Sequence, residues 1–130
     1  MSLYSKLQPK GPSGFGYGST AEDVTAGLSL AGKTYLVTGC NSGLGLETAR
    51  VLALRGGRII GTARTAEKAR SALAPLGGNT FGLECELSEP RSVRTSVQAV
   101  KAALAGARID ALICNAGIMA LPVNEQKHGV

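Results

Sequence analysis

An α/β fold is predicted, in which a parallel sheet of about four strands lies between layers formed by three main helices. Short apolar runs alternate along the chain with longer segments whose apolar residues recur every three or four positions. That is the pattern of strands and amphipathic helices. A glycine-rich turn joins the first apolar run to the first helical segment. A strand–helix series of this kind gives parallel strands with right-handed crossovers.

The predicted strands are short runs of apolar residues without strict polar alternation, as expected for strands buried on both faces. The third run is the weakest of them. They comprise residues 34–38, 58–63, 80–85 and 109–114.

Each main helix is predicted from the residues at its two ends. Polar side chains that accept hydrogen bonds favour the N-cap, and glycine or proline favours the end of a helix. The predicted helices are 43–55, stopped by Gly56 and Gly57; a helix capped by Thr65 that ends near Pro75; and a helix capped by Ser88 that Gly106 ends.

A chain of 130 residues is expected to form one domain with a single hydrophobic core, rather than two domains. Residues 1–29 are predicted to be a flexible arm, because glycine and proline interrupt residues 1–19. Within the arm, 20–24 predict a short helical turn capped by Ser19 or Thr20. Residues 30–130 form the predicted strand–helix part, and its tail, 120–130, is predicted to be a loop.

Composition argues against a nucleic-acid ligand and against a membrane span. The net charge is +5, but the basic residues are scattered and only 4% of residues are aromatic, with no tryptophan. Few aromatic side chains are therefore present on which nucleic-acid bases could stack. No apolar run is long enough to cross a bilayer, and no charged-then-apolar signal opens the chain. We expect a cytoplasmic protein.

Cysteine and histidine usage argues against a metal site. The three cysteines, Cys40, Cys85 and Cys114, include no Cys-x-x-Cys pair, and His128 is the only histidine. An odd number of cysteines beside predicted strands favours reduced thiols over disulfides or metal ligands.

The glycine-rich turn, Thr38 to Gly45, predicts a nucleotide-phosphate site. Gly39 permits the tight turn, Gly43 lets a diphosphate approach the backbone, and Gly45 lets the helix pack close to the strand. The first helical turn offers free N–H groups and a favourable dipole to an anion. A P-loop is excluded because Leu46, not Lys, follows the last glycine. The candidate cofactor contacts here are Gly39, Asn41, Ser42, Gly43, Leu44 and Gly45.

Arg64, at the end of the second predicted strand, favours NADP over NAD. An acidic residue at this position would hold the ribose hydroxyls of NAD, but the first acid is Glu67. A guanidinium instead pairs with a 2′-phosphate. The alternative is that Arg64 is a solvated loop charge.

Two further turns follow strands at the same predicted edge of the sheet. Glu86 and Leu87 follow the third strand, where Glu86 either faces the adenine amino group or is a surface acid before the next helix. Asn115, Ala116 and Gly117 follow the fourth strand. For Asn115 we favour a structural clamp between strands over direct chemistry, and Gly117 lets the backbone approach a ribose.

These motifs together resemble the short-chain dehydrogenase/reductase family. Thr38 to Gly45 fits its Thr-Gly-x-x-x-Gly-x-Gly signature, and Asp110 with Cys114 to Gly117 resembles its Asp-x-Leu-x-x-Asn-Ala-Gly strand and turn. The stretches 19–24, 30–33 and 63–64 look most like the retinol-dehydrogenase-like and WW-domain-oxidoreductase-like branch. Cys114 and Glu86 depart mildly from the residues usual there. The resemblance implies a Rossmann fold, NADP(H) binding and hydride transfer between cofactor and an alcohol or carbonyl substrate.

The family's catalytic Ser and Tyr-x-x-x-Lys are expected to be missing. Tyr4, Tyr17 and Tyr35 are the only tyrosines, and no lysine stands four residues after any of them. We therefore expect residues 30–130 to be the N-terminal half of a dinucleotide-binding Rossmann domain, which is incomplete, holds no catalytic residue and is inactive alone. The alternative is a natural short form, a non-catalytic NADP-binding or interaction module. A Rossmann methyltransferase is disfavoured, because Arg64 stands where an acid would hold the ribose of its cofactor. In the full-length enzyme the resemblance implies a small-molecule substrate and a homo-oligomer.

Overall fold

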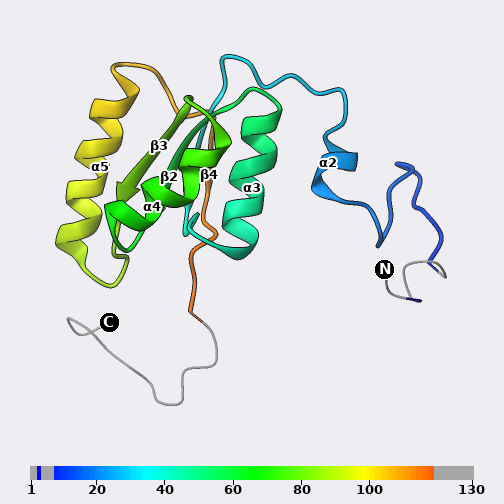
Figure 1. The fold of residues 1–130 in the computed structure, drawn as a ribbon, viewed down its shortest axis with the longest axis horizontal. Coiled ribbons are helices and arrows are strands. Elements are labelled where there is room, and N and C mark those ends of the chain that lie inside the picture. Colours follow the sequence, from blue (N-terminus) through cyan, green and yellow to red (C-terminus); the bar gives the residue numbers. More distant parts are fainter. Residues whose placement is uncertain (1–2, 4–7, 119–130) are drawn as a thin grey trace.

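A four-stranded parallel sheet forms the centre of the computed structural model, which describes residue 3 and residues 8–118 (Figure 1). The strands are β1 (Thr34–Thr38), β2 (Arg58–Ala63), β3 (Thr80–Glu84) and β4 (Ala111–Ile113), in the order β3-β2-β1-β4. Every pairing is parallel. This confirms the predicted Rossmann-type α/β fold, because the order 3-2-1-4 is that of its first nucleotide-binding half and the strand that follows it.

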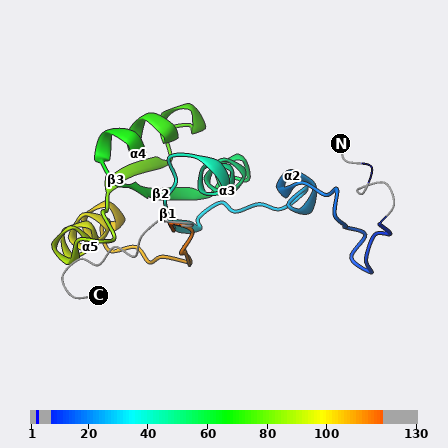
Figure 2. The ribbon, with the colours of Figure 1, turned by 90° about the horizontal axis from the view of Figure 1, so that it is seen from below.

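Helices lie on both faces of the sheet, so the fold has three layers (Figure 2). The helices α3 (Gly43–Leu54) and α4 (Ala66–Leu73), followed by the 3-10 turn η1 (Ala74–Leu76), cover one face. The helix α5 (Pro90–Leu104) lies on the other face and packs against β3. A further short helix, α2 (Ala21–Val24), lies beside α3.

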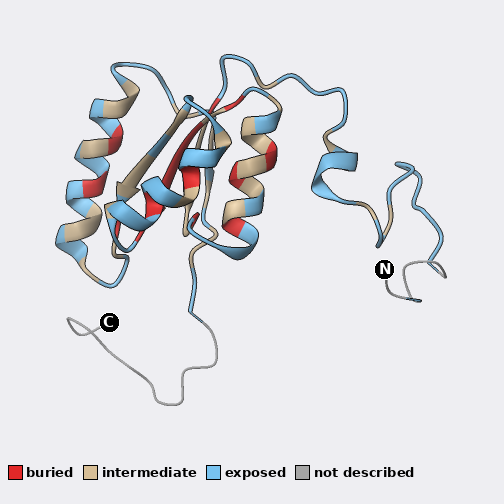
Figure 3. Cartoon of the chain, in the orientation of Figure 1, coloured by how far each residue is buried: buried red, intermediate tan, exposed pale blue. Residues whose placement is uncertain are grey.

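The hydrophobic core lies between the sheet and the α3–α4 layer. Figure 3 shows buried residues gathered where the helices face the strands. β2 is buried from Ile59 to Ala63, which explains its uninterrupted apolar sequence. The core cluster comprises Val37, Cys40, Ala49, Ile59, Ala63, Ala69 and Leu73.

The predicted helical turn near residue 20 is α2, and two arginines of the α3 segment hold it. Thr20 forms a capping box with Asp23. The Arg50 guanidinium pairs with the Glu22 carboxylate, and Arg55 Nε donates to Thr25 Oγ1 at 3.0 Å. The flexibility of residues 1–29 stays a prediction, and 1–2 and 4–7 lie outside the described residues, as does the tail 120–130.

The N-terminus of α5 differs from the prediction. Glu89, not Ser88, is the N-cap, and Pro90 occupies the first turn, where its missing N–H costs nothing. The Ser88 hydroxyl does not cap the helix but donates to Glu86 Oε1 at 2.9 Å. Gly106 follows the helix as predicted, but Ala105 is the C-cap and adopts a left-handed conformation with φ 49°.

β4 is shorter than the predicted strand 109–114, and side-chain hydrogen bonds hold both of its ends to β1. The Asp110 carboxylate accepts the Thr34 N–H at 2.9 Å. This hydrogen bond, together with nearby Lys33, lowers the pKa of the Asp110 carboxyl. At the other end, Asn115 N donates to the Thr38 hydroxyl at 3.1 Å. In the described part of the chain, no helix is long and apolar enough to cross a membrane.

Gly82 sets the distance between β3 and α4, and its replacement by alanine tests the packing. A Cβ at Gly82 would lie 2.7 Å from the backbone carbonyl carbon of Ala69. Because backbone cannot rotate away, we expect Gly82→Ala to lower the free energy of unfolding by about 1–3 kcal/mol, measured by chemical denaturation. A Cβ at Gly78 meets nothing within 4 Å, so Gly78→Ala is the control and should change stability by less than about 1 kcal/mol. Equal stability of the two variants would contradict this account.

Candidate functional site

A crevice with a volume of about 800 Å³ lies where the strands of the sheet end. Parallel strands direct their carboxyl ends to one edge, which is where ligands bind in open α/β sheets. Nine of the predicted site residues line the crevice together: Gly39, Asn41, Ser42, Arg64, Glu86, Leu87, Asn115, Ala116 and Gly117.

The glycine-rich loop turns sharply at Gly39, as its sequence predicts. Gly39 has a φ of +67°, and a Cβ there would lie 2.9 Å from Ala116 Cα. The loop after β1 and the turn after β4 therefore touch at a point where only hydrogen fits. Gly43 also has a positive φ, +56°, and a Cβ there would meet nothing within 4 Å. The backbone at Gly43 is thus open to an approaching group.

Gly45 does not line the crevice, but it determines how closely the first turn of α3 packs against the loop after β1. A Cβ at Gly45 would collide with the Gly39 carbonyl oxygen and with the Asn115 side-chain amide. This is the close helix–strand packing predicted for the third glycine. Gly43 and Leu44 are also absent from the lining residues, and the Leu44 side chain is exposed.

The N-terminus of α3 meets the crevice through Ser42, its N-cap. The Ser42 side chain makes no capping hydrogen bond, and the first turn carries no acidic residue. The Ser42 side chain therefore does not compete with a ligand for the backbone N–H groups of the first turn of α3. With the positive end of the helix dipole, they form an arrangement suited to a phosphate or another anion.

Thr38 and Asn115 join the tips of β1 and β4. The Thr38 hydroxyl accepts the backbone N–H groups of Asn115 at 3.1 Å and Ala116 at 3.0 Å. The Asn115 side-chain amide donates to the carbonyl oxygens of Thr38 at 3.0 Å and Gly39 at 3.1 Å. Asn115 is therefore a clamp between strands, as the sequence predicts. The central role of Thr38 was not predicted, although a hydroxyl at the end of a central strand is the signal that points to it.

Arg64 follows β2 and is exposed at the rim of the crevice. Within the described part of the chain it forms no ion pair. Its guanidinium is therefore available to an anionic ligand in the crevice.

Glu86 and Leu87 form the side of the crevice that follows β3. Glu86 Oε1 accepts the Ser88 backbone N–H at 3.1 Å, so the carboxylate is held by the turn that it precedes. The Glu86 N–H donates to Ser92 Oγ at 2.9 Å, which ties the turn to α5. The geometry fits both interpretations of Glu86, because this residue lines the crevice and also belongs to the turn that precedes α5.

Three residues that line the crevice were not predicted: Ala63, Cys85 and Ile118. The ends of strands β2 and β3 place the first two there. All three cysteines are free thiols, with Cys40 and Cys85 buried and Cys114 exposed. Burial raises the pKa of the Cys40 thiol to about 11. No cluster of potential metal ligands occurs among the described residues.

Comparisons with known proteins agree on one family. The family model described as short chain dehydrogenase matches residues 33–129. The chloroplastic short-chain dehydrogenase TIC 32 B of Brassica napus is 35% identical over the whole chain, which spans 42% of that relative. The WW domain-containing oxidoreductase of Drosophila melanogaster is 37% identical over 86% of this chain and 29% of its own length, in line with the branch that the sequence resembles.

A solved structure supports the same assignment. A metagenomic short-chain oxidoreductase in complex with NADP superposes with a TM-score of 0.61 at 35% identity. The match covers 68% of this chain and 41% of that one. The chain thus spans less than half the length of each of these relatives.

The cysteines provide a test of the loop geometry. We expect iodoacetamide at pH 8 to modify Cys114 rapidly and Cys40 hardly at all. Cys40 is inaccessible, and with its thiol pKa raised to about 11 roughly a thousandth of it is thiolate at that pH. Peptide mapping by mass spectrometry gives the rates, and Cys114→Ser removes the fast site as a control. Labelling of Cys40 as fast as Cys114 would show that the loop packs differently.

Proposed function

The chain belongs to the short-chain dehydrogenase family, and from this premise we propose that it is the NADP(H)-binding portion of an oxidoreductase. The family reaction that we propose is hydride transfer between the cofactor and an alcohol or carbonyl substrate. The observation that carries the proposal is the meeting of the glycine loop, Arg64 and the Asn115 turn at one crevice.

The residues around the crevice fit a dinucleotide. The diphosphate is proposed to lie against the backbone from Asn41 to Gly43, where the α3 N-terminus offers N–H groups and Gly43 leaves space. Gly45 and Leu44 contribute through the backbone of the same turn. The bound cofactor supplies or accepts the hydride, and the chain's part is to bind and orient it.

The rest of the crevice is proposed to hold the two ends of that cofactor. Glu86 and Leu87 flank the adenine, and Ala116 and Gly117 offer backbone to the ribose beyond the diphosphate. Asn115 contributes by positioning the turn after β4, because its side-chain amide already donates to two carbonyl oxygens.

NADP rather than NAD is proposed because of the charge at the end of β2. An exposed guanidinium without an ion pair among the described residues matches a 2′-phosphate, whereas the ribose hydroxyls of NAD are best held by an acid. Arg64 is the residue that makes this choice.

Binding without turnover is proposed for the chain as given. The sequence offers no Tyr-x-x-x-Lys, and its three tyrosines are followed four residues later by Gln8, Ala21 and Gly39. A cytoplasmic location, a small-molecule substrate for the whole enzyme and a homo-oligomeric state remain predictions.

The second candidate is a non-catalytic NADP-binding or interaction module. It is favoured by β4, which is an edge strand of the sheet that the described residues form and whose Leu112 side chain is 57% exposed. An uncovered apolar edge invites a partner.

Removing the Arg64 guanidinium tests the cofactor preference. We expect Arg64→Ala to weaken NADP binding by about tenfold to a hundredfold, because a charge-assisted bidentate pair is lost. NAD binding should change little. Isothermal titration with both cofactors measures this, and Arg70→Ala, an exposed arginine on α4 outside the crevice, is the matched control. Unchanged NADP affinity in Arg64→Ala would overturn the assignment.

Turnover by the 130-residue chain tests the proposed absence of catalysis. We expect no NADPH oxidation above background with aldehyde or ketone substrates, because no tyrosine acid with a lysine partner is present. The measurement is the loss of NADPH absorbance with chain purified free of longer forms. Saturable, enzyme-dependent oxidation would contradict the proposal while leaving the cofactor site intact.

A further inference from the structure

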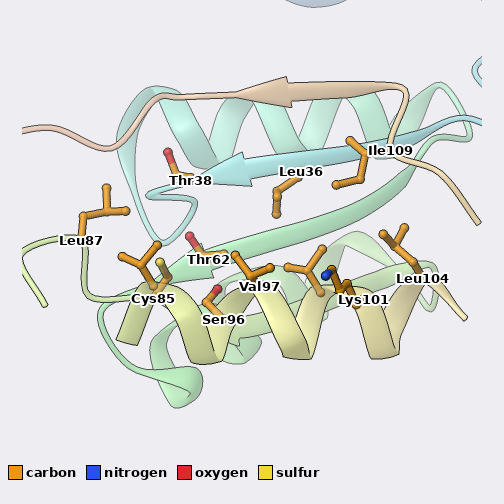
Figure 4. Close-up of a pocket in the computed structure, with 12 residues that line it drawn as sticks. Leu36, Thr38, Thr62, Cys85, Leu87, Ser96, Val97, Lys101, Leu104 and Ile109 are labelled. Carbon is orange, nitrogen blue, oxygen red and sulfur yellow. The ribbon is translucent and has the colours of Figure 1, made fainter. Parts of the chain in front are cut away.

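The turn after β3, residues 85–88, borders two cavities. One is the crevice at the strand ends, and the other is an apolar groove of about 410 Å³ that runs along α5, between that helix and Leu36 of β1 (Figure 4). Cys85 and Leu87 line both cavities, whereas Glu86 lines the crevice alone. Glu86 is therefore the charged residue that this turn brings to the proposed adenine end of the crevice.

The backbone of the turn is held from two sides. The Ser92 hydroxyl oxygen on α5 accepts the Glu86 N–H at 2.9 Å, and the Glu86 carbonyl oxygen accepts the Glu89 N–H at 3.1 Å. The Cys85 N–H donates to the Ala63 carbonyl oxygen at 2.8 Å, which continues the pairing of β3 with β2. The backbone of Glu86 is thus tied to both the sheet and the helix.

The Glu86 side chain is held by Ser88. Its Oε1 atom accepts two hydrogen bonds from that one residue, from the Ser88 N–H at 3.1 Å and from the Ser88 hydroxyl at 2.9 Å. A glutamate has three rotatable side-chain bonds, and ordering such a side chain when a ligand binds weakens the affinity. Because Ser88 orders the carboxylate beforehand, the ligand does not have to.

A carboxylate in this place distinguishes purines by the group at position 6. Adenine carries an amino group there, which donates hydrogen bonds, whereas a 6-oxo purine carries an acceptor. An ionised carboxylate only accepts hydrogen bonds. It therefore attracts a 6-amino group and repels a 6-oxo group.

We propose that Ser88 is a positioning residue for base recognition: by holding Glu86 Oε1, it directs the carboxylate to the 6-amino group and sets a preference for adenine over 6-oxo purines. Ser88 does not line the crevice, so it acts through Glu86. The two interpretations of Glu86 become one arrangement, because the contact with its own turn is what positions the side chain. This inference rests on the proposed NADP site.

Two cofactors that differ only at position 6 of the base measure the preference. They are NADP and its hypoxanthine analogue, and the readout is the ratio of their dissociation constants, analogue over NADP, from isothermal titration. Contacts to the phosphates and riboses are the same for both ligands and cancel in this ratio. For the unaltered chain we expect a ratio of about ten or more, because the analogue loses a hydrogen bond to a charged group.

Removing the Ser88 hydroxyl tests its role. We expect Ser88→Ala to lower the ratio by about threefold to tenfold, since the ligand must then order the carboxylate itself. Ser88→Thr keeps a hydroxyl and should restore the ratio, whereas a turn that had only lost stability would bind both ligands more weakly and leave the ratio unchanged. Ser71→Ala, at an exposed serine on α4 outside the crevice, is the matched control. Circular dichroism checks that each variant folds.

An amide in place of the carboxylate tests the geometry. In Glu86→Gln the two Ser88 donors should hold the amide oxygen as they hold Oε1, which leaves the amide N–H groups toward the base. Those groups donate to a 6-oxo group, so we expect the ratio to fall below one. In the double variant Glu86→Gln with Ser88→Ala the amide turns freely, and the ratio should be about one.

Several outcomes would overturn the inference. A ratio near one in the unaltered chain would reject Glu86 as the residue that distinguishes the base. An unchanged ratio in Ser88→Ala, or a lowered ratio that Ser88→Thr does not restore, would reject the role of Ser88. In each of these cases NADP still binds the unaltered chain, so the cofactor proposal stands. Absence of NADP binding by the unaltered chain would overturn the cofactor site and this inference together.

Discussion

The pairing of β1 with β4 is the contact on which the crevice depends. It joins segments 76 or 77 residues apart, and side chains close it at both ends. Asp110 accepts the Thr34 N–H at the start of the pair, and Asn115 reaches the Thr38 and Gly39 carbonyl oxygens at its end. A slip of one residue would break both contacts and turn Leu112 to the other face. The register thus brings the two turns of the site together.

That register supports the site that we propose for a ligand with several negative charges. Gly39 and Gly45 allow the loop, the helix and the Asn115 turn to come within contact distance. The Ser42 side chain does not cap the first turn of α3. Arg64, which forms no ion pair with any described residue, adds a positive charge at the rim. Hydrogen bonds to charged ligands are stronger than those between neutral groups, so these donors are most effective when a phosphate reaches them.

Local chemistry made much of the fold predictable from sequence. Thr20 and Thr65 are the N-caps that their side chains favour, and Gly39 takes the positive φ that its turn requires. Ser88 was predicted to cap α5 and does not, because a nearby carboxylate competes for its hydroxyl and Pro90 starts the helix. The convergence of Thr38 on Asn115 and the open groove depend on contacts far apart in sequence, which no local pattern contains. The place of Cys85 in the lining of the crevice was not predicted for the same reason.

The most direct test of the account is a map of backbone amide chemical shifts as NADP is added to the isotope-labelled chain. The account predicts the largest changes in the amides of Gly39 to Gly45, Arg64 and Asn115 to Gly117, with smaller ones at Glu86 and Leu87. The groove along α5 should respond only near Leu87. Changes centred on Val97 and Leu104, or none in the glycine loop, would contradict a cofactor site at the carboxyl ends of the strands.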